Sequence, residues 1–522
     1  MIKSVLRNKN LIYLAILVLL AIPLLFPLFH QGFFISDDGE WMIIRLSDFH
    51  RSLRGGQFPV RWAGRLNQEY GYPVFNFLYP GILYLGEVLH LLGLNFTNSV
   101  KTLFGLSFIF SGIFTFLWLS QFFNKFAAFI GAICYMYAPY LSYDVYKRGS
   151  LGEALALTVI PLCLFAFQRQ NVFLGSISYG LLVLTHNTIA FLATPILITY
   201  KLILWQKEEK KQKVWQILSP LIFGLGLSAF FWIPALYDKQ FTIFDQTVIS
   251  NWQEHFLAWK DISLIGIPAI LVWIVSLIYI RKKDKLFLLF SIVFILSLIF
   301  AMPASTVIWS IFPLSNLIQF PFRLISLTMI SSAFLTAFLI NKVQTKIAVI
   351  PLGIILVMVN IFMTTQLSKR VERVVRDESY YTTNEGTTNT QDEYLPIWVK
   401  DKPQGRPESK VEIIHGGGNI YNLQTNSKKT EFKITANLDS KIQINTVYFP
   451  GWQVNMDGSS INIDYSNRQG VITLSVPKGE HTVIAAFSET PIRLSSDIIS
   501  LISLTFLGFT FVQRKLWKNF SI

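Results

Sequence analysis

Charged residues and cysteines are both scarce in this chain of 522 residues. Only 15% of the residues are charged and 52% are hydrophobic, whereas a typical soluble domain has about 25% charged residues. So little charge would not keep so apolar a chain in solution, which excludes a water-soluble fold. An aromatic content of 15% excludes a disordered chain as well. Cys134 and Cys163 both lie in apolar stretches, so neither a disulfide framework nor a thiolate metal site is expected.

Several well-known catalytic motifs are also missing. The sequence has no Gly-rich loop with Lys for a nucleotide phosphate, no His-Glu-x-x-His and no Gly-x-Ser-x-Gly. Gly416-Gly417-Gly418 lies in a region of short strands and is typical of a turn. Nucleotide hydrolysis and serine or zinc hydrolase chemistry are therefore disfavoured.

What the chain does have is long apolar stretches. A bilayer core is spanned by about 20 apolar residues in a helix, and we identify roughly twelve such stretches. The first follows basic residues and has no small-residue cleavage site after it, so we interpret it as an uncleaved anchor rather than a signal peptide. The run 172–206 is interpreted as two short helices around His186. The predicted spans are 11–29, 99–123, 126–142, 153–168, 172–186, 188–206, 214–236, 262–280, 286–302, 322–341, 347–366 and 495–513.

The net charge of +14 and the pI near 9.5 are explained by where the basic residues lie. They gather at alternate ends of the predicted spans, as expected for cytoplasmic ends by the positive-inside rule. Both termini are therefore predicted to be cytoplasmic, and no nucleic-acid partner is expected. The residues concerned are Lys3, Arg7, Lys9, Lys125, Arg169, Lys207, Lys210, Lys211, Lys213, Arg281, Lys282, Lys283, Lys285, Lys342, Lys346, Arg514, Lys515 and Lys518.

Three long segments lie on the outer side in this topology: 31–98, 236–261 and 367–494. The last is rich in Gly, Asn, Thr and Ser, and its short apolar runs alternate with turn residues, as in antiparallel strands. We therefore predict a helical transmembrane domain over 1–366, an extracytoplasmic β-sandwich or jelly-roll domain over 367–494, and a final helix with a cytoplasmic tail over 495–522. The predicted strands are 431–438, 441–449, 471–476 and 481–487.

The first outer segment carries the strongest candidates for chemistry. Asp37 and Asp38 follow the first span at the bilayer surface, where a carboxylate can act as a general base or help to bind a divalent cation such as Mg²⁺ or Mn²⁺. The alternative is a solvated loop in which Ser36 or Asp37 caps a helix. Acidic and basic residues balance in this loop, with Arg45 and Arg61 among the bases, which favours a pocket for an anionic substrate.

An aromatic and apolar run follows from Phe75 to Leu94, and we expect it to lie along the membrane interface. Phe75, Phe77 and Tyr79 could face a lipid chain there. They could equally be aromatic residues of an ordinary interface belt.

Further candidates lie at the outer ends of predicted spans. Arg148, near the start of a helix that carries Glu153, could bind a phosphate, or it could extend to the interface as membrane-edge cations often do. Polar residues at membrane depth are functional candidates by default. On this ground the remaining candidate site residues are His186, Asn187, Gln319 and Arg323.

These pieces together resemble a known family. The stretch Asp38 to Pro80 and a series of shorter motifs are similar, in the same order, to the bacterial membrane proteins called 6-pyruvoyl-tetrahydropterin synthase-related, relatives of the YfhO-like proteins. These proteins look like glycosyltransferases of the GT-C architecture. The shorter motifs are 147–153, Thr185-His186-Asn187, 231–236, 319–323, Glu393-Tyr394-Leu395-Pro396 and 448–452.

The resemblance implies transfer of a sugar from a polyprenyl-phosphate donor to an envelope glycan, lipid or protein on the outer face. Asp38, or Asp37 if the register shifts by one, would take the proton of the acceptor, and the anomeric centre would invert. Arg148, Arg323 or Arg61 would stabilise the leaving phosphate. Two departures leave a metal requirement open: Met42 stands where many relatives have His, and Tyr237-Asp238 where they often have Glu.

Two other functions compete with this one. A transporter or flippase of lipid-linked precursors would be expected to show an inverted repeat and broken helices at the bilayer midplane. A non-catalytic scaffold would use the outer β domain to bind a glycan or an assembly partner.

Overall fold

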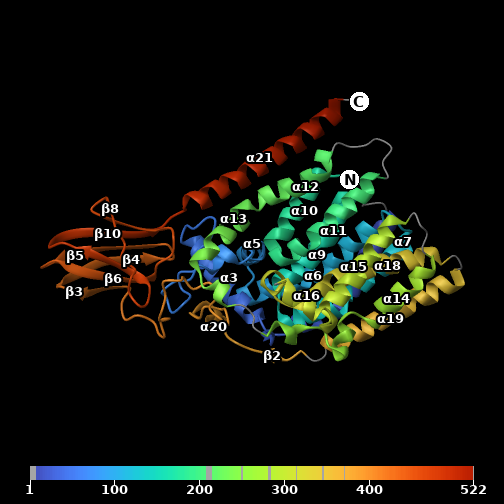
Figure 1. Ribbon diagram of the computed structural model, residues 1–522, viewed down its shortest axis with the longest axis horizontal. Coiled ribbons are helices and arrows are strands. Elements are labelled where there is room, and N and C mark those ends of the chain that lie inside the picture. Colours follow the sequence, from blue (N-terminus) through green and yellow to red (C-terminus); the bar gives the residue numbers. More distant parts are fainter. Residues whose placement is uncertain are drawn as a thin grey trace.

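The computed structural model describes residues 8–206, 214–247, 251–279, 284–312, 314–343, 346–368 and 371–520. The molecule is elongated, with strands at one end and helices over the rest (Figure 1). Helix α21 (Pro491–Phe520) begins beside the strands and runs diagonally away from them. Several basic residues of the orientation argument lie outside the described residues: Lys3, Arg7, Lys207, Lys210, Lys211, Lys213, Arg281, Lys282 and Lys283.

The chain is a polytopic helical membrane protein, as predicted. Within the described residues, eight helices are long and apolar enough to cross a bilayer, or up to ten if two bent helix pairs count as one span each. The pairs bend by 67° after Leu227 and by 84° after Ala301. All twelve predicted stretches fall on helices, but those at Val172–Thr185 and Pro268–Tyr279 are shorter apolar helices. The number of full-length spans among the described residues is therefore smaller than the roughly twelve predicted.

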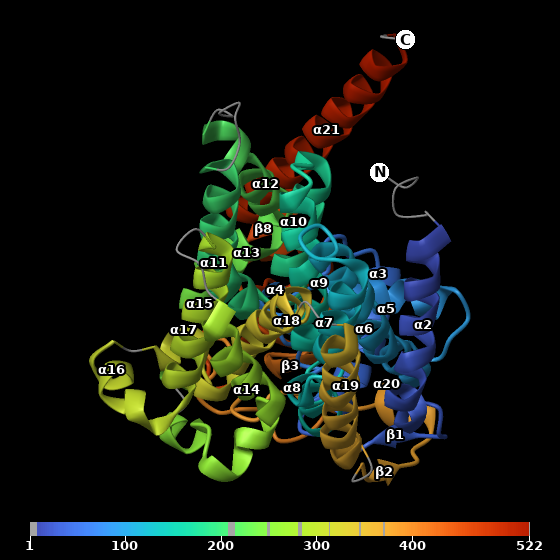
Figure 2. The same cartoon turned by 90° about the vertical axis from the view of Figure 1, so that its right-hand side faces the viewer.

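The apolar run 172–206 is two helices, because His186 has an extended backbone (φ −164°) that interrupts the helical hydrogen bonding. The two most buried spans are those of α9 and α18, which lie near the middle of the bundle in Figure 2. The helices of this part are α2 (Asn8–Leu25), α6 (Phe96–Leu119), α7 (Lys125–Met136), α8 (Pro139–Tyr143), α9 (Leu151–Gln168), α10 (Val172–Thr185), α11 (Asn187–Gln206), α12 (Val214–Leu227), α13 (Ala229–Asp238), α14 (Ile267–Ser276), α15 (Lys285–Ala301), α16 (Thr306–Ile311), α17 (Ser315–Ile318), α18 (Ile325–Lys342) and α19 (Lys346–Ser368).

The first outer segment is folded rather than a loose loop. It contains the short strand β1 (Phe33–Phe34) and the helices α3 (Gly39–Arg54), α4 (Val74–Phe77) and α5 (Gly81–Leu91). Strand β1 pairs with β2 (Arg373–Val374), and α20 (Glu378–Thr382) packs on α3, so residues 371–382 lie against this segment. Val88 and Leu91 on α5, and Leu92 directly after it, are exposed apolar residues.

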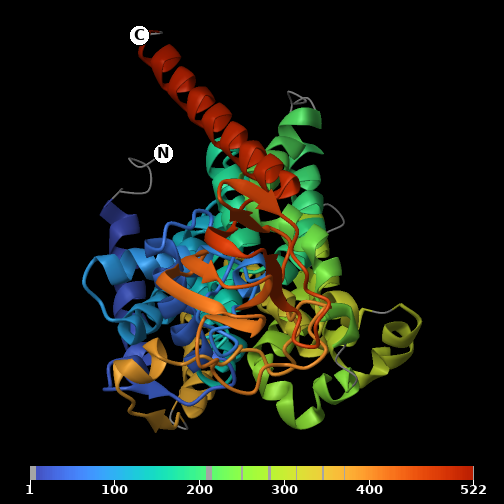
Figure 3. The same cartoon turned by 90° about the vertical axis from the view of Figure 1, so that its left-hand side faces the viewer.

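The strands form an antiparallel β sandwich, with the helical part behind it in Figure 3. One sheet has the order β4-β5-β10-β7-β8 and the other β3-β6-β9. Burial alternates along β5, as expected for a strand with one face on a core. The bounds are β3 (Val411–His415), β4 (Gly418–Asn426), β5 (Lys429–Ala436), β6 (Ser440–Val447), β7 (Trp452–Met456), β8 (Ser459–Ile461), β9 (Val471–Val476) and β10 (Gly479–Phe487).

The sandwich is joined to the helical part by apolar and ionic contacts. Trp62 and Tyr70 of the first outer segment lie in the sandwich core beside Phe449. Buried Arg61 donates hydrogen bonds to both carboxylate oxygens of Glu489, at 2.8 and 2.9 Å, and to Asp497 at 2.7 Å. One cation thus ties the first outer segment to the start of α21.

We predict that Arg61→Leu lowers the stability of the whole protein. The change leaves Glu489 and Asp497 close together without their cation, and breaking such a pair costs on the order of 3 kcal/mol. The measurement is the thermal unfolding temperature of the purified protein in detergent. Lys429→Ala is the control, because its ion pair with Glu431 is solvent-exposed and worth little. An equal shift in the two variants would contradict a structural role for Arg61.

Candidate functional site

A cavity of about 1540 Å³ lies where the helical part meets the outer segments. Apolar residues of α11, α15 and α17 form one wall, among them Phe191, Leu296 and Leu317. Polar residues from the first outer segment and from residues 388–394 form the other. The cavity is therefore amphipathic.

Asp38 faces this cavity from the N-terminal end of α3. The backbone N–H groups of Asp37 and Asp38 donate to the carbonyl oxygens of Lys147 and Arg148, at 3.0 and 2.8 Å. The predicted helix cap is supplied by Ser36, whose hydroxyl accepts from the N–H of Gly39 at 3.2 Å. The exposed Asp38 carboxylate makes no capping bond and has no hydrogen-bond partner among the described residues. It is thus available to a substrate.

Asp37 is placed differently. Its carboxylate is exposed and forms an ion pair with Lys147 at 3.1 Å, and it does not line the cavity. The adjacent aspartates therefore do not converge on one point. Within the described residues there is also no group of three His, Cys, Asp or Glu side chains placed to hold a metal ion.

A tight backbone contact holds Asp38 against the helix that carries Arg148. The π-helical turn η2 (Asp144–Arg148) ends at Gly149, which has φ +66°. A Cβ atom on Gly149 would lie 2.4 Å from the backbone nitrogen of Gly39. Only glycine allows this approach without strain.

Arg148 and Arg323 belong to a buried ionic network. Glu153 Oε2 accepts from Arg148 Nη1 at 2.6 Å and from Arg323 Nε at 3.1 Å. Asp144 binds Arg148 from the preceding turn, and Tyr140 donates to Glu153 at 2.6 Å. The two arginines line the cavity and Glu153 lies behind them. Because two carboxylates balance two guanidinium groups, this network carries little net charge.

Arg45 is a buried cation on the cavity wall without such compensation. Its Nε and Nη2 atoms donate to the hydroxyl and carbonyl oxygens of Thr388, at 2.9 and 2.6 Å. No carboxylate of the described residues lies within ion-pair distance of it. Thr388 has φ +66°, an unusual conformation for a β-branched residue. Arg45 is therefore the cavity residue best placed to attract an anion.

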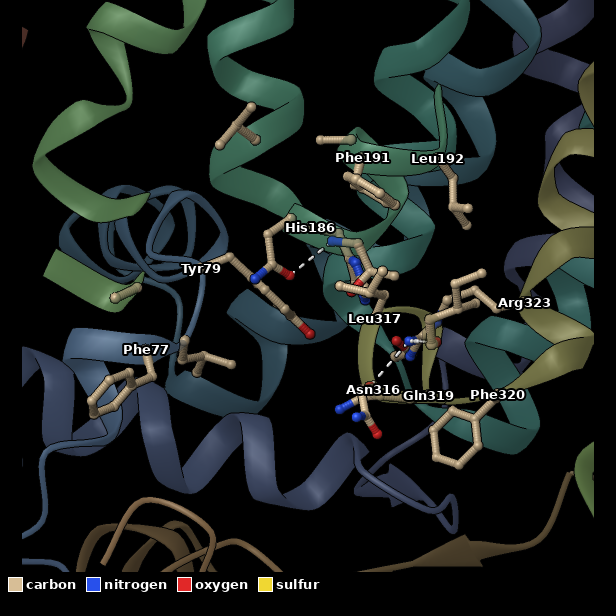
Figure 4. A pocket seen from close by; sticks show the side chains of 18 of the residues that line it. Phe77, Tyr79, His186, Phe191, Leu192, Asn316, Leu317, Gln319, Phe320 and Arg323 are labelled. Carbon is tan, nitrogen blue, oxygen red and sulfur yellow. Dashed lines mark hydrogen bonds between the residues drawn. The ribbon is translucent and has the colours of Figure 1, made fainter. Parts of the chain in front are cut away.

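His186, Asn187 and Gln319 also line the cavity. The ring of His186 stacks on Tyr79, with 4.8 Å between centroids, and burial raises the pKa of Tyr79 to about 12. Gln319 accepts from Arg323 Nη1 at 3.1 Å. Figure 4 shows Tyr79 and His186 on one side, Gln319 and Arg323 on the other, and Phe191 near the apolar end.

Three predicted site residues lie elsewhere than their proposed roles require. Arg61 does not line the cavity, because Glu489 and Asp497 hold it at the sandwich junction. Phe75 is buried against Phe49 and contacts no part of the cavity. Phe77 does line the cavity, but it stacks on Tyr394 of the outer domain at the polar end.

Glu393 is a cavity carboxylate that the sequence argument did not select. It occurs in the Glu393-Tyr394-Leu395-Pro396 motif, but a single acidic residue in a long outer segment gives no sign of its surroundings. Burial raises its pKa; the charge of Arg45 opposes this shift and the charge of Asp38 adds to it. Asp38 and Glu393 therefore face the same space from opposite ends of the chain.

Comparisons with solved structures give distant likenesses. The arabinofuranosyltransferase AftD from Mycobacteria superposes with a TM-score of 0.47 at 15% identity, over 68% of this chain and 26% of its own. An oligosaccharyltransferase from Archaeoglobus fulgidus in the apo form has a TM-score of 0.40 at 12% identity, over 73% of this chain and 56% of its own. This chain thus spans about a quarter of the length of the first. No curated protein sequence matches.

The sequence itself matches one family of membrane proteins. Residues 76–368, more than half of the chain, match the 6-pyruvoyl-tetrahydropterin synthase related domain. This match confirms the resemblance found in the sequence motifs. The chain therefore belongs to the 6-pyruvoyl-tetrahydropterin synthase related family of membrane proteins.

Proposed function

We propose that this protein is a GT-C-type glycosyltransferase that moves a sugar from a polyprenyl-phosphate donor to a cell-envelope acceptor. One observation carries the proposal: a single cavity presents an unpartnered carboxylate, three buried guanidinium groups and an apolar wall of membrane helices. These match the three parts of the reaction, which are an acceptor hydroxyl, a leaving phosphate and a prenyl chain. Both termini would be cytoplasmic, with the β sandwich and the cavity mouth outside.

The prenyl chain would lie against α11 and α15. Phe191, Leu296 and Leu317 line the cavity, yet each is about half exposed on the protein surface. The apolar end of the cavity thus opens sideways, where bilayer lipid would surround the helices. In this proposal the prenyl chain contacts this apolar wall and not Phe75, Phe77 and Tyr79, which were the lipid-contact candidates from the sequence.

The donor phosphate would bind at Arg45, with the remaining N–H groups of Arg148 and Arg323 nearby. Charge-assisted hydrogen bonds from guanidinium groups suit a phosphate well. Arg45 forms no ion pair with a carboxylate of the described residues, whereas Asp144 and Glu153 pair with the other two. Glu153 is then a positioning residue that keeps both arginines at the cavity.

In the transfer step, Asp38 would take the proton of the acceptor hydroxyl as its oxygen attacks the anomeric carbon. The bond between that carbon and the phosphate oxygen breaks, and the electron pair leaves with the polyprenyl phosphate. Attack opposite the leaving group inverts the anomeric centre. Hydrogen-bond donors that already surround the leaving phosphate oxygen stabilise the negative charge that develops on it, and this lowers the activation barrier of the transfer.

A divalent cation finds few ligands in this arrangement. Among the described residues, Asp38 and Glu393 are the carboxylates that line the cavity. Asp37 does not line it and forms an ion pair with Lys147. These residues do not fit a resident metal, so no step is derived through one.

We predict that Asp38→Asn reduces sugar transfer by about 10²- to 10⁴-fold, the usual contribution of a general base. The measurement is transfer from a polyprenyl-phosphate sugar by the purified protein. Asp37→Asn is the matched control and should stay close to wild type, because Asp37 points away from the cavity. Undiminished transfer in Asp38→Asn would refute the mechanism, and unchanged envelope glycans in a deletion strain would favour a transporter or scaffold.

Gly149→Ala should impair catalysis while the protein remains folded. The added methyl group would push Gly39, and with it Asp38, away from η2. We expect kcat to fall at least about tenfold, since small displacements of a reacting group are costly. Gly93→Ala is the control: its φ is also positive, at +103°, but nothing lies within 4 Å of a Cβ there. Equal activity of the two variants would show that the contact does not position Asp38.

The raised pKa of Glu393 predicts a pH-dependent stability. The folded protein holds this proton more tightly than the unfolded chain does, so stability falls as the pH rises from the ordinary value of 4.5 through the raised value. Glu393→Gln should lack this fall, and Asp38→Asn should lessen it, because the Asp38 charge contributes to the shift. Thermal unfolding across the pH range tests this. Parallel curves for wild type and Glu393→Gln would contradict it.

A further inference from the structure

Three aromatic residues gather outside the cavity on the sandwich side. Tyr448 and Tyr465 stack with 3.9 Å between ring centroids, and Trp398 meets both rings edge-on, at 5.1 and 5.3 Å. Tyr448 follows β6, and Tyr465 lies between β8 and β9. We name these three residues the aromatic platform.

The platform lies at the edge of the sandwich core, against which Tyr448 packs. Core aromatic residues such as Phe432 and Phe449 are fully buried, whereas all three platform residues are partly exposed. No described residue forms a hydrogen bond with the indole N–H of Trp398 or with the hydroxyl group of either tyrosine. Part of each of the three side chains, with the indole N–H and the two phenol groups, is therefore available to a ligand.

The platform continues from the mouth of the cavity. Tyr394 lines the cavity, and Trp398 lies four residues further along the same segment, a distance of at most about 13 Å in a fully extended chain. Phe241 stacks on Trp398, with 6.0 Å between centroids, and its carbonyl oxygen accepts from the N–H of Ile397. Phe244, three residues after Phe241, lines the cavity and stacks on Tyr394. Aromatic rings thus lead from the cavity to the platform.

We propose that the aromatic platform binds the non-reacting sugars of a glycan-chain acceptor. A sugar ring has an apolar C–H face and a rim of hydroxyl groups, which match a ring face beside free indole and phenol groups. Two ion pairs flank the platform, Arg468 with Asp401 and Lys441 with Asp464. This inference rests on the proposed function, and it specifies a glycan rather than a lipid or protein acceptor.

The test measures binding separately from transfer. Size-graded fragments of the source organism's envelope polysaccharide are immobilised, and the detergent-purified full-length protein is bound to them in an interferometer. Trp398→Ala should raise the Kd for long fragments about tenfold, the factor that corresponds to about 1.4 kcal/mol. Trp398→Phe keeps a ring and should retain most of the affinity, and Tyr421→Ala, on β4 away from the platform, should match wild type.

The transfer assay then compares acceptors of different length. Trp398→Ala should lower kcat/KM about tenfold for long fragments and leave transfer to a monosaccharide glycoside unchanged. Asp38→Asn should instead lower transfer to acceptors of every length and keep binding. Equal affinity of Trp398→Ala and wild type, or no binding of any fragment, overturns the platform. Platform-dependent binding without transfer by the wild-type protein supports the platform and overturns the proposed transferase function.

Discussion

The site depends on one buried ionic contact, in which Glu153 holds Arg148 and Arg323 together. Isolated charges at this depth would be very costly to bury, and pairing them makes the arrangement stable. Arg148 ends η2, Glu153 lies in the first turn of the adjacent α9, and Arg323 precedes α18, so the contact fixes the η2–α9 corner against a segment 170 residues away in sequence. Because the carbonyl oxygen of Arg148 also accepts from Asp38, this contact determines where the free carboxylate lies.

The outer domain completes the cavity as well as covering it. Thr388 and Glu393 come from the segment before the sandwich, yet one holds Arg45 and the other faces Asp38. Trp62, from the first outer segment, is buried in the sandwich core. Because each part contributes residues to the other, neither the helical part nor the segment with the sandwich contains a complete site alone.

Much of this architecture could be predicted from local patterns. Apolar length predicted every membrane helix, and alternation of β-branched residues predicted β9 at its observed bounds of Val471–Val476. Asp38 was selected as a candidate because it follows the first span at the predicted bilayer surface, in a loop whose acidic and basic residues balance. The positions of Arg61, Phe75 and Glu393 could not be predicted, since they depend on partners that lie more than 300 residues away or on burial by another segment. Helix length could not be predicted everywhere, because the bends after Leu227 and Ala301 interrupt otherwise uniform apolar runs, whereas the break at His186 was predicted.

The sequence by itself determined that this is a helical membrane protein with a strand-rich region near its C-terminal end, because hydrophobic length and alternation are properties of neighbouring residues. It also determined the family, through short motifs spread along the chain. Only the tertiary structure decided which charged residues meet. Arg148 and Arg323 are neutralised by Asp144 and Glu153, whereas Arg45 keeps its charge at the cavity, and this difference arises from the distance between side chains in space.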